Sequence, residues 1–140
     1  MKELKLTALG VLTLGLVVAA TPAIADDVSG ADRLICSSVQ ATVCGSDGDC
    51  EIGPPWNWNV PNFIVIDFKK GELSTTPASG ERRVTPFKNH ESAEGVTYLQ
   101  GVEGGRAFSF VINQATGQVS IAVAREGITV SVFGACTPHR

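Results

Sequence analysis

The sequence predicts an all-β domain: a small antiparallel meander of about eight strands that curls into a closed or nearly closed barrel. Three successive runs in the second half of the chain alternate apolar and polar residues with a period of two, which is typical of strands with one buried face. Short turns separate these runs. After residue 25 no segment shows a 3.6-residue apolar period, so almost no helix is expected. A two-sheet β-sandwich is the alternative architecture.

The first 25 residues form a predicted signal peptide. Two lysines precede an apolar stretch from Leu6 to Ala20, which is too short for a membrane helix. Ala23-Ile24-Ala25 then matches the small-x-small pattern that precedes signal cleavage. We therefore expect a protein secreted to the periplasm and cleaved after Ala25, with no transmembrane segment afterwards. Residues 26–140 are expected to form a single β-barrel-like domain.

Composition limits the partners of the mature chain. Cleavage after Ala25 leaves nine basic and thirteen acidic side chains, which is a net side-chain charge of −4. An acidic domain does not bind nucleic acid through bulk basic charge, so no nucleic-acid partner is expected. The full sequence is 44 % hydrophobic and 18 % charged, which excludes a disordered chain.

Four cysteines in an exported chain predict two disulfides. Strong turn sequence between Cys44 and Cys50 favours a local bridge between them. The second bridge, Cys36–Cys136, would then join the first strand to the last; Cys36–Cys50 with Cys44–Cys136 is the main alternative. Cys136 and His139 have the spacing of a metal-ligand pair, but no second pair accompanies them, so neither a metal nor a cofactor is predicted.

The elements of the first half follow from β-branched and aromatic runs bounded by turn residues. Predicted strands are Arg33–Cys44, Asn62–Phe68, Leu73–Thr76 and Arg82–Lys88, with Gly45–Pro55 and Pro77–Glu81 as loops. Pro86 places the last of these strands at an edge or a bulge. Asp67 ends an apolar strand, and we expect it on the solvent face; a buried pair with Arg106 is the alternative.

The elements of the second half are the alternating runs. Predicted strands are Gly95–Gln100, Arg106–Ile112, Val119–Ala124 and Ile128–Val132. Phe108, Phe110 and Ile112 share one face of their strand. Strands that follow one another in sequence are expected to pair, and the Cys36–Cys136 bridge would lie at the seam of the barrel.

Several segments resemble known proteins. The segment Gly105–Gly117, the tail Phe133–Cys136, the early cysteine spacing, Pro54-Pro55-Trp56 and Phe63–Asp67 together resemble an uncharacterised family of small exported proteins of Gram-negative bacteria. This resemblance covers nearly all of the mature chain. It implies a location in the bacterial envelope and does not imply an activity.

Two looser resemblances concern shorter motifs. Gly53-Pro54-Pro55-Trp56 is similar to the Gly-x-Trp signature of lipocalin-type barrels, with one additional residue between glycine and tryptophan. Ser79-Gly80-Glu81-Arg82-Arg83 is similar to the Ser-Gly-x-x-Tyr loop of periplasmic lysozyme inhibitors, with arginine in place of the aromatic residue. The second likeness implies an inhibitory loop at Ser79–Arg83.

The candidate ligand-binding residues are two tryptophans and two arginines. Trp56 and Trp58 could line a ligand mouth, or they could plug one end of the barrel. Arg82 and Arg83 could bind an anionic partner, or they could be ordinary charges on an edge strand. Lys69-Lys70 is the other basic cluster. No residue is assigned a catalytic role.

A non-catalytic periplasmic binding or interaction module is therefore the expected function. Its partner would be an unidentified small ligand or an envelope protein. Inhibition of an envelope-targeting enzyme such as lysozyme is the alternative. A small hydrolase is a third hypothesis: His90 neighbours Glu91, but no serine stands in a Gly-x-Ser-x-Gly elbow, so no enzymatic activity is expected.

Overall fold

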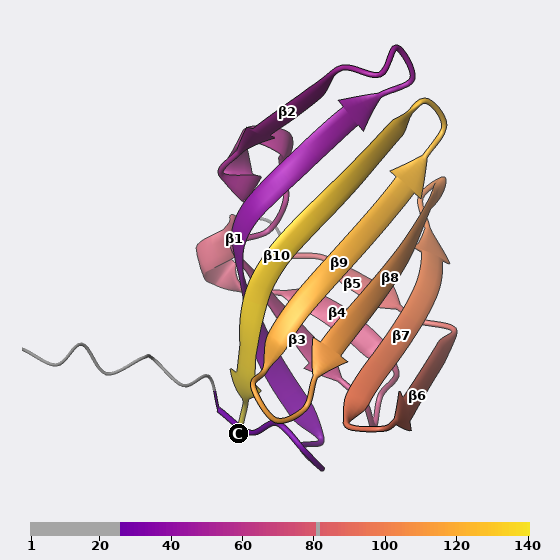
Figure 1. The fold of residues 1–140 in the computed structure, drawn as a ribbon. Coiled ribbons are helices and arrows are strands. Elements are labelled where there is room, and N and C mark those ends of the chain that lie inside the picture. The colour runs from indigo at the N-terminus through magenta and orange to yellow at the C-terminus, as the bar shows by residue number, and fades with distance from the viewer. Residues whose placement is uncertain (1–25, 81) are drawn as a thin grey trace, which may run out of the picture.

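The computed structural model describes residues 26–80 and 82–140 (Figure 1). The predicted signal peptide and Glu81 lie outside the described residues. The strands are β1 Arg33–Gly45, β2 Cys50–Gly53, β3 Phe63–Asp67, β4 Glu72–Thr75, β5 Val84–Pro86, β6 Asn89–Ala93, β7 Val96–Glu103, β8 Arg106–Asn113, β9 Gln118–Arg125 and β10 Ile128–Pro138. Two 3-10 helices, η1 Pro55–Trp58 and η2 Pro77–Ser79, are the helical elements of the described chain.

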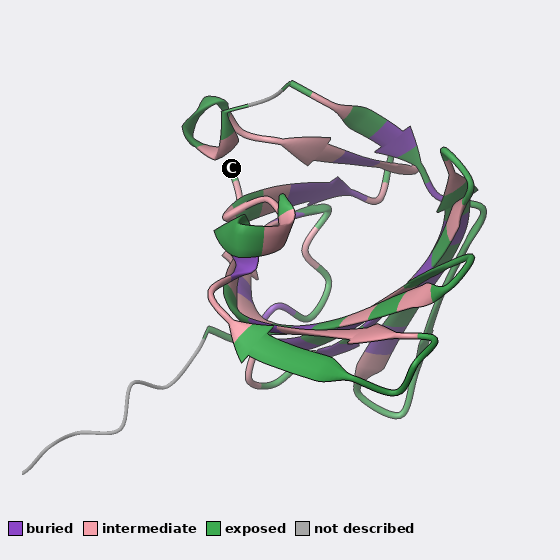
Figure 2. Ribbon diagram, turned by 90° about the horizontal axis from the view of Figure 1, so that it is seen from above, coloured by how far each residue is buried: buried purple, intermediate pink, exposed green. Residues whose placement is uncertain are grey.

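The strands form one antiparallel sheet in the order β5-β4-β3-β1-β10-β9-β8-β7-β6. The first and last strands pair at its centre, as the sequence predicts, and β5 and β6 are its two edges. β2 is off this path and pairs with the second half of β1, while β3 pairs with the first half. Figure 2 shows the sheet curling around an interior, with β3, β4 and β5 facing the strands β7 to β10. The all-β, barrel-like fold is thus confirmed as a strongly curled half-barrel.

The two edges of the sheet meet where β5 runs into β6. Phe87 and Lys88 link these strands directly, and the two residues bond to opposite sides. The Phe87 N–H donates to the Gly71 carbonyl at 3.0 Å, beyond β4, whereas the Lys88 N–H donates to the Gln100 carbonyl of β7 at 2.8 Å. The two edges of the sheet are therefore connected here only through the backbone of Phe87 and Lys88, and no hydrogen bonds pair β5 with β6.

A bulge in β1 keeps its apolar residues on the inner face. The register with β10 shifts between Ser38 and Gln40, so Val39 is an extra residue. Without it, Cys36 and Ala41 would lie on opposite faces, because their separation is odd. With it, both are buried, and Val39 is exposed on the outside.

Some elements differ from the predicted ones. The predicted loop Gly45–Pro55 contains β2, and the predicted strand Arg82–Lys88 is reduced to the three residues of β5. β6 was not predicted, because all of its residues are exposed and none of the alternation that marks a half-buried strand is present. Pairing with β7, not a buried face of its own, makes β6 a strand.

Both predicted disulfides are confirmed. Cys36 on β1 stands directly opposite Cys136 on β10, and Cys44 stands opposite Cys50 in the β1–β2 hairpin. Both bridges are formed, with S–S distances of 2.04 and 2.07 Å. The first bridge is fully buried and joins residues 100 positions apart, whereas the second spans only 6 positions.

Rows of side chains that run across the strands fill the lower part of the interior, toward the end of the half-barrel where β1 begins (Figure 1). One row runs across four strands through Leu99, Phe110, Ile121 and Val132, all of them buried. The row above it begins at Gly101, opposite Phe108. A Cβ atom on Gly101 would lie 2.3 Å from Cζ of Phe108, so the phenylalanine ring occupies the space above this glycine. The glycine thereby lets the ring lie flat across the sheet.

Removal of the two disulfides should have unequal effects. The loop closed by Cys36–Cys136 is about 100 residues long, so the Cys36→Ala/Cys136→Ala pair should lower the free energy of unfolding by about 4 to 5 kcal/mol. The Cys44→Ala/Cys50→Ala pair should lower it by about 2 to 3 kcal/mol, because its loop is short. Urea denaturation of the two variants measures both values. A larger loss from the Cys44–Cys50 variant would contradict this ranking.

Alanine at position 101 should collide with the ring of Phe108. Gly101→Ala is expected to cost about 1 to 3 kcal/mol of unfolding free energy, because the ring must leave its position over the sheet. In a Phe108→Leu background the same substitution should cost measurably less. A double-mutant cycle by urea denaturation gives the coupling. Equal costs in both backgrounds would show that the ring is not the cause.

Candidate functional site

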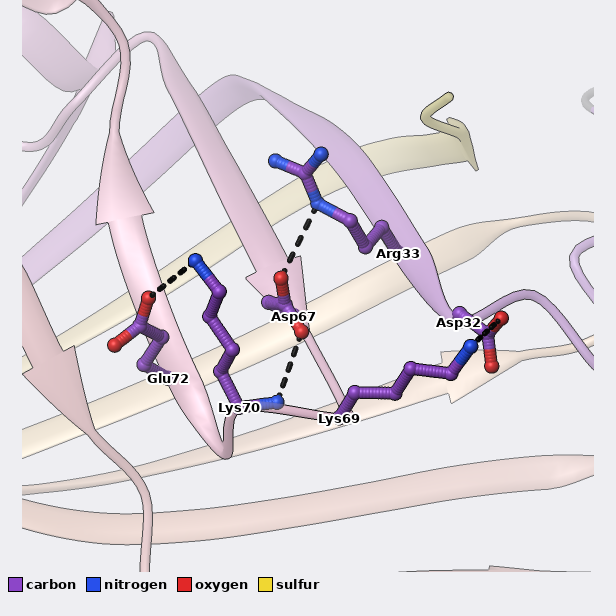
Figure 3. Close-up of polar contacts among 6 residues, drawn as sticks. All are labelled: Asp32, Arg33, Asp67, Lys69, Lys70 and Glu72. Carbon is purple, nitrogen blue, oxygen red and sulfur yellow. Dashed lines mark hydrogen bonds and ion pairs between the residues drawn. The ribbon is translucent and has the colours of Figure 1, made fainter.

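The lower end of the half-barrel carries a polar cluster around Asp67 (Figure 3). Asp67 ends β3, and its carboxylate accepts the backbone N–H of Lys70 at 2.9 Å and pairs with Nε of Arg33 at 3.3 Å. Asp67 alternates with the core residue Ile66 and lines an outer groove, in agreement with the predicted face, but it is only 8 % exposed. The alternative partner Arg106 was wrong, since Arg33 of the neighbouring strand occupies that role. The carboxylate holds the β3–β4 turn together.

The two lysines of this turn are paired with neighbouring acids. Nζ of Lys69 lies 2.6 Å from Asp32, and Nζ of Lys70 lies 3.8 Å from Glu72 (Figure 3). The hydrogen bond and the negative charge of Asp32 raise the pKa of Lys69 above its ordinary value. All four side chains are at least partly exposed to solvent, where such pairs are weak. The Lys69-Lys70 cluster is therefore compensated locally and offers no unbalanced positive charge.

The opposite end of the half-barrel contains a cavity of about 430 Å³, which we call the mouth cavity. Its strand wall comes from β1, β9 and β10 and consists of Val43, Val123, Ile128 and Val130. Val43, Val130 and Val123 stand directly opposite one another across three paired strands. They continue the row of Phe108, so the apolar floor of the core passes into the apolar wall of the cavity.

The rim of the mouth cavity carries arginines. Arg106 begins β8 and Arg125 ends β9, and the two residues are paired directly across the strands. Arg106 is in phase with Phe108 and Phe110, and Arg125 is in phase with Val123, so both side chains start on the inner face. Both line the mouth cavity. Arg106 is half-buried, whereas Arg125 is exposed.

A smaller cavity of about 100 Å³ adjoins the mouth cavity and is lined by residues of β3, β4 and β5 and by residues of β7 and β8. The two cavities share the lining residues Pro61, Arg83 and Arg106. Glu103 lines the smaller one and is the direct partner of Arg106 across the β7–β8 hairpin. The predicted residue Arg83 thus reaches the interior side of the structure and lies beside both cavities.

The two predicted tryptophans have different surroundings. Trp58 lines the mouth cavity opposite the strand wall and packs against the core. A Cβ atom on Gly53 would lie 3.0 Å from its Cη2, so this glycine gives the indole room. Trp56 is 63 % exposed and lines an adjoining hollow of about 80 Å³, which shares Arg83 with the mouth cavity. Trp58 therefore belongs to the wall of the candidate site, and Trp56 lies outside it.

The loop that resembles lysozyme inhibitors is only partly described. Ser79 is held within the fold, because its Oγ donates to the Phe63 carbonyl and accepts the Phe63 N–H, both at 3.1 Å. Arg82 is exposed and lines an outer groove, away from the mouth cavity. Glu81 lies outside the described residues. Arg83 lines this groove as well as the mouth cavity, whereas Arg82 lines the groove and not the mouth cavity.

The histidines have no catalytic partner in the described part of the chain. The ring of His90 lies between Phe68 and Phe87, with ring centroids 5.5 and 5.7 Å away. No hydrogen bond from a described serine or threonine hydroxyl reaches the side chain of His90 or His139. Within residues 26–80 and 82–140, no three histidine, cysteine or carboxylate side chains gather as metal ligands. The helices of this part are too short to cross a membrane.

Comparisons with protein-family models, with curated proteins and with solved structures find no match for this chain. The candidate site is accordingly defined by its own geometry.

Sequence analysis missed most of the strand wall and half of the arginine pair. Alternation placed Val123 and Val130 on the inner faces of their strands, but nothing in the sequence showed that these residues line a cavity and not the filled core. Arg125 lay outside the predicted strand Val119–Ala124. Asn62 was also missed: its Oδ1 is buried beside the 80 Å³ hollow and has no hydrogen-bond partner among the described residues. Such an atom carries no sequence signal, because its isolation arises from packing.

Loss of the Asp67 carboxylate should destabilise the turn. Asp67→Ala removes the acceptor of the Lys70 N–H and the partner of Arg33, which should lower the unfolding free energy by about 1 to 2 kcal/mol. Asp67→Asn retains the acceptor and should lose less. Lys69→Ala is the control and should leave the stability unchanged, since its pair is exposed. Equal losses in thermal or urea denaturation for Asp67→Ala and Lys69→Ala would contradict this assignment.

Proposed function

We propose that the protein is a non-catalytic binding module of the bacterial envelope, and that it holds a small ligand in the mouth cavity. The observation that carries the proposal is the volume of about 430 Å³ next to a continuous apolar wall. Ligand pockets are commonly concave, mostly apolar and about 300 to 1,000 Å³ in volume. A chain of this size gains stability by filling its interior, so an unfilled apolar end favours a binding role.

The strand wall suits a preformed site. Val43, Val123 and Val130 project from three strands that are hydrogen-bonded along their whole length. The Cys36–Cys136 and Cys44–Cys50 bridges further restrain β1. Binding to such a wall requires little ordering of the protein, which lowers the cost of association.

Export to the periplasm belongs to the same proposal. Two disulfides form and persist in an oxidising compartment. Cleavage after Ala25 would release a chain that begins with Asp26, close to the start of the described domain. Enzyme inhibition through the loop at Ser79–Arg83 has less support, because the Ser79 hydroxyl is already hydrogen-bonded to the backbone of Phe63.

Filling the mouth cavity should abolish binding of an apolar probe. The neutral fluorophore N-phenyl-1-naphthylamine is expected to bind the wild-type protein with an increase in fluorescence. In Val123→Phe/Val130→Phe, two rings occupy the cavity from directly paired positions, so the affinity should fall at least tenfold.

The matched control is Ala122→Phe/Ser131→Phe. These residues are also directly paired, but both are exposed on the outer face of the same two strands. The control should bind the probe like the wild type. The proposal fails if the wild type does not bind the probe, or if the inner and outer variants lose affinity equally.

A further inference from the structure

We infer that the ligand of the mouth cavity is an anionic amphiphile, with its charged headgroup between Arg106 and Arg125 and its apolar tail against the strand wall. This inference rests on the proposed function and adds the chemical class of the ligand. Three observations support it: the direct pairing of Arg106 with Arg125, the charges of the residues that line the cavity, and the volume of the cavity.

The register places two positive charges side by side. Arg106 and Arg125 are direct cross-strand partners on the inner face, and both line the cavity. Like charges in this arrangement destabilise a sheet. A carboxylate, sulfate or phosphate group between the two guanidinium groups would replace their repulsion by attraction to the anion. Guanidinium groups bind such oxygens through paired, charge-assisted hydrogen bonds.

The described residues of the lining supply no opposite charge. Within residues 26–80 and 82–140, three arginines and no aspartate or glutamate line the mouth cavity. Glu103 is the direct partner of Arg106 on the β7 side and lines the smaller cavity, but it forms no ion pair with Arg106. Among the ion pairs of residues 26–80 and 82–140, none includes Arg83, Arg106 or Arg125. The lysines at the opposite end of the barrel, by contrast, each have a carboxylate partner.

The polarity changes in one direction along the strands. On β9 the inner face passes from buried Ile121 through half-buried Val123 to exposed Arg125. On β8 it passes from Phe110 and Phe108 to Arg106. An anionic amphiphile can contact the apolar wall with its tail and the arginines with its headgroup. An inorganic anion would make no contact with the apolar wall, and a neutral hydrocarbon would form no ion pair with the arginines.

The volume sets the length of the tail. A cavity of about 430 Å³ has room for roughly a dozen groups of the size of a water molecule or a methylene. A single chain of about eight carbons with its headgroup fits this space. The concave wall suits one monomeric molecule and not the flat surface of a bilayer.

Four ligands with the same chain length test the inference by isothermal titration calorimetry. Octanoate and octyl sulfate should bind the wild type at least tenfold more tightly than 1-octanol, and octyltrimethylammonium should bind more weakly than 1-octanol. Octanoate against octyl sulfate distinguishes a carboxylate site from a sulfate- or phosphate-type site. Inorganic phosphate should not bind measurably, since it has no tail.

The variant Arg106→Gln/Arg125→Gln should lose at least tenfold in affinity for the anionic ligands and retain its affinity for 1-octanol within twofold. Lys69→Gln/Lys70→Gln removes the same charge at the opposite end of the barrel and should bind all ligands like the wild type. The thermal midpoint of the ligand-free arginine variant should equal or exceed that of the wild type, because it relieves the repulsion between the paired guanidinium groups. This second measurement also verifies that the variant folds.

The outcomes separate the two proposals. If 1-octanol binds as tightly as octanoate, the cavity is a binding site, but the inference of an anionic headgroup is overturned. If the lysine variant binds octanoate as weakly as the arginine variant does, the loss of affinity comes from the net charge of the protein and not from the two rim arginines. The inference is then also overturned. If none of the ligands nor the neutral fluorophore binds, the proposed function itself fails. Binding to anionic vesicles without binding of monomeric octanoate would overturn the inference in favour of a membrane surface.

Discussion

The pairing of β1 with β10 is the constraint on which the rest of the structure depends. It joins the start of the described domain to its end, from Leu34 opposite Pro138 to Gly45 opposite Ile128. Contacts so distant in sequence are entropically costly to form. The buried Cys36–Cys136 bridge offsets part of that cost by removing conformations from the unfolded chain. Without this pairing, the meander from β6 to β10 and the strands β3 to β5 would be separate ribbons.

The same pairing builds the candidate site. It aligns Val43 with Val130, which is in turn aligned with Val123, so one apolar row crosses three strands. Below that row the interior is filled by large side chains from β7 to β10. Above it, Arg106 and Arg125 replace apolar residues at the rim. The two ends of the half-barrel therefore differ in kind. The Asp67 end carries locally paired charges and a structured turn, and the mouth end combines free volume with arginines that form no ion pair among the described residues.

The sequence was informative wherever one strand had one buried face. Strict alternation predicted the strands containing Phe108, Ile121 and Val130, and turn chemistry predicted the Cys44–Cys50 bridge. Prediction failed for β2 and β6, because these short polar strands are determined by the strands they pair with and not by their own composition. The burial of Asp67 was missed for a related reason: it depends on Arg33, a residue whose proximity follows from the β1–β3 register. Predicting the arginine pair would have required the β8–β9 register. Predicting the cavity would have required knowing where along the strands the filled rows of side chains end.

The central claim is that a ligand lies at the mouth end, between the strand wall and the arginine rim. A ¹H–¹⁵N correlation spectrum recorded during titration with octanoate tests it most directly. The account predicts that shift changes concentrate at Val43, Trp58, Arg106, Val123, Arg125 and Val130, and that the turn from Asp67 to Glu72 is unaffected. Shift changes confined to that turn, or to the outer face around Ala122 and Ser131, would contradict the account.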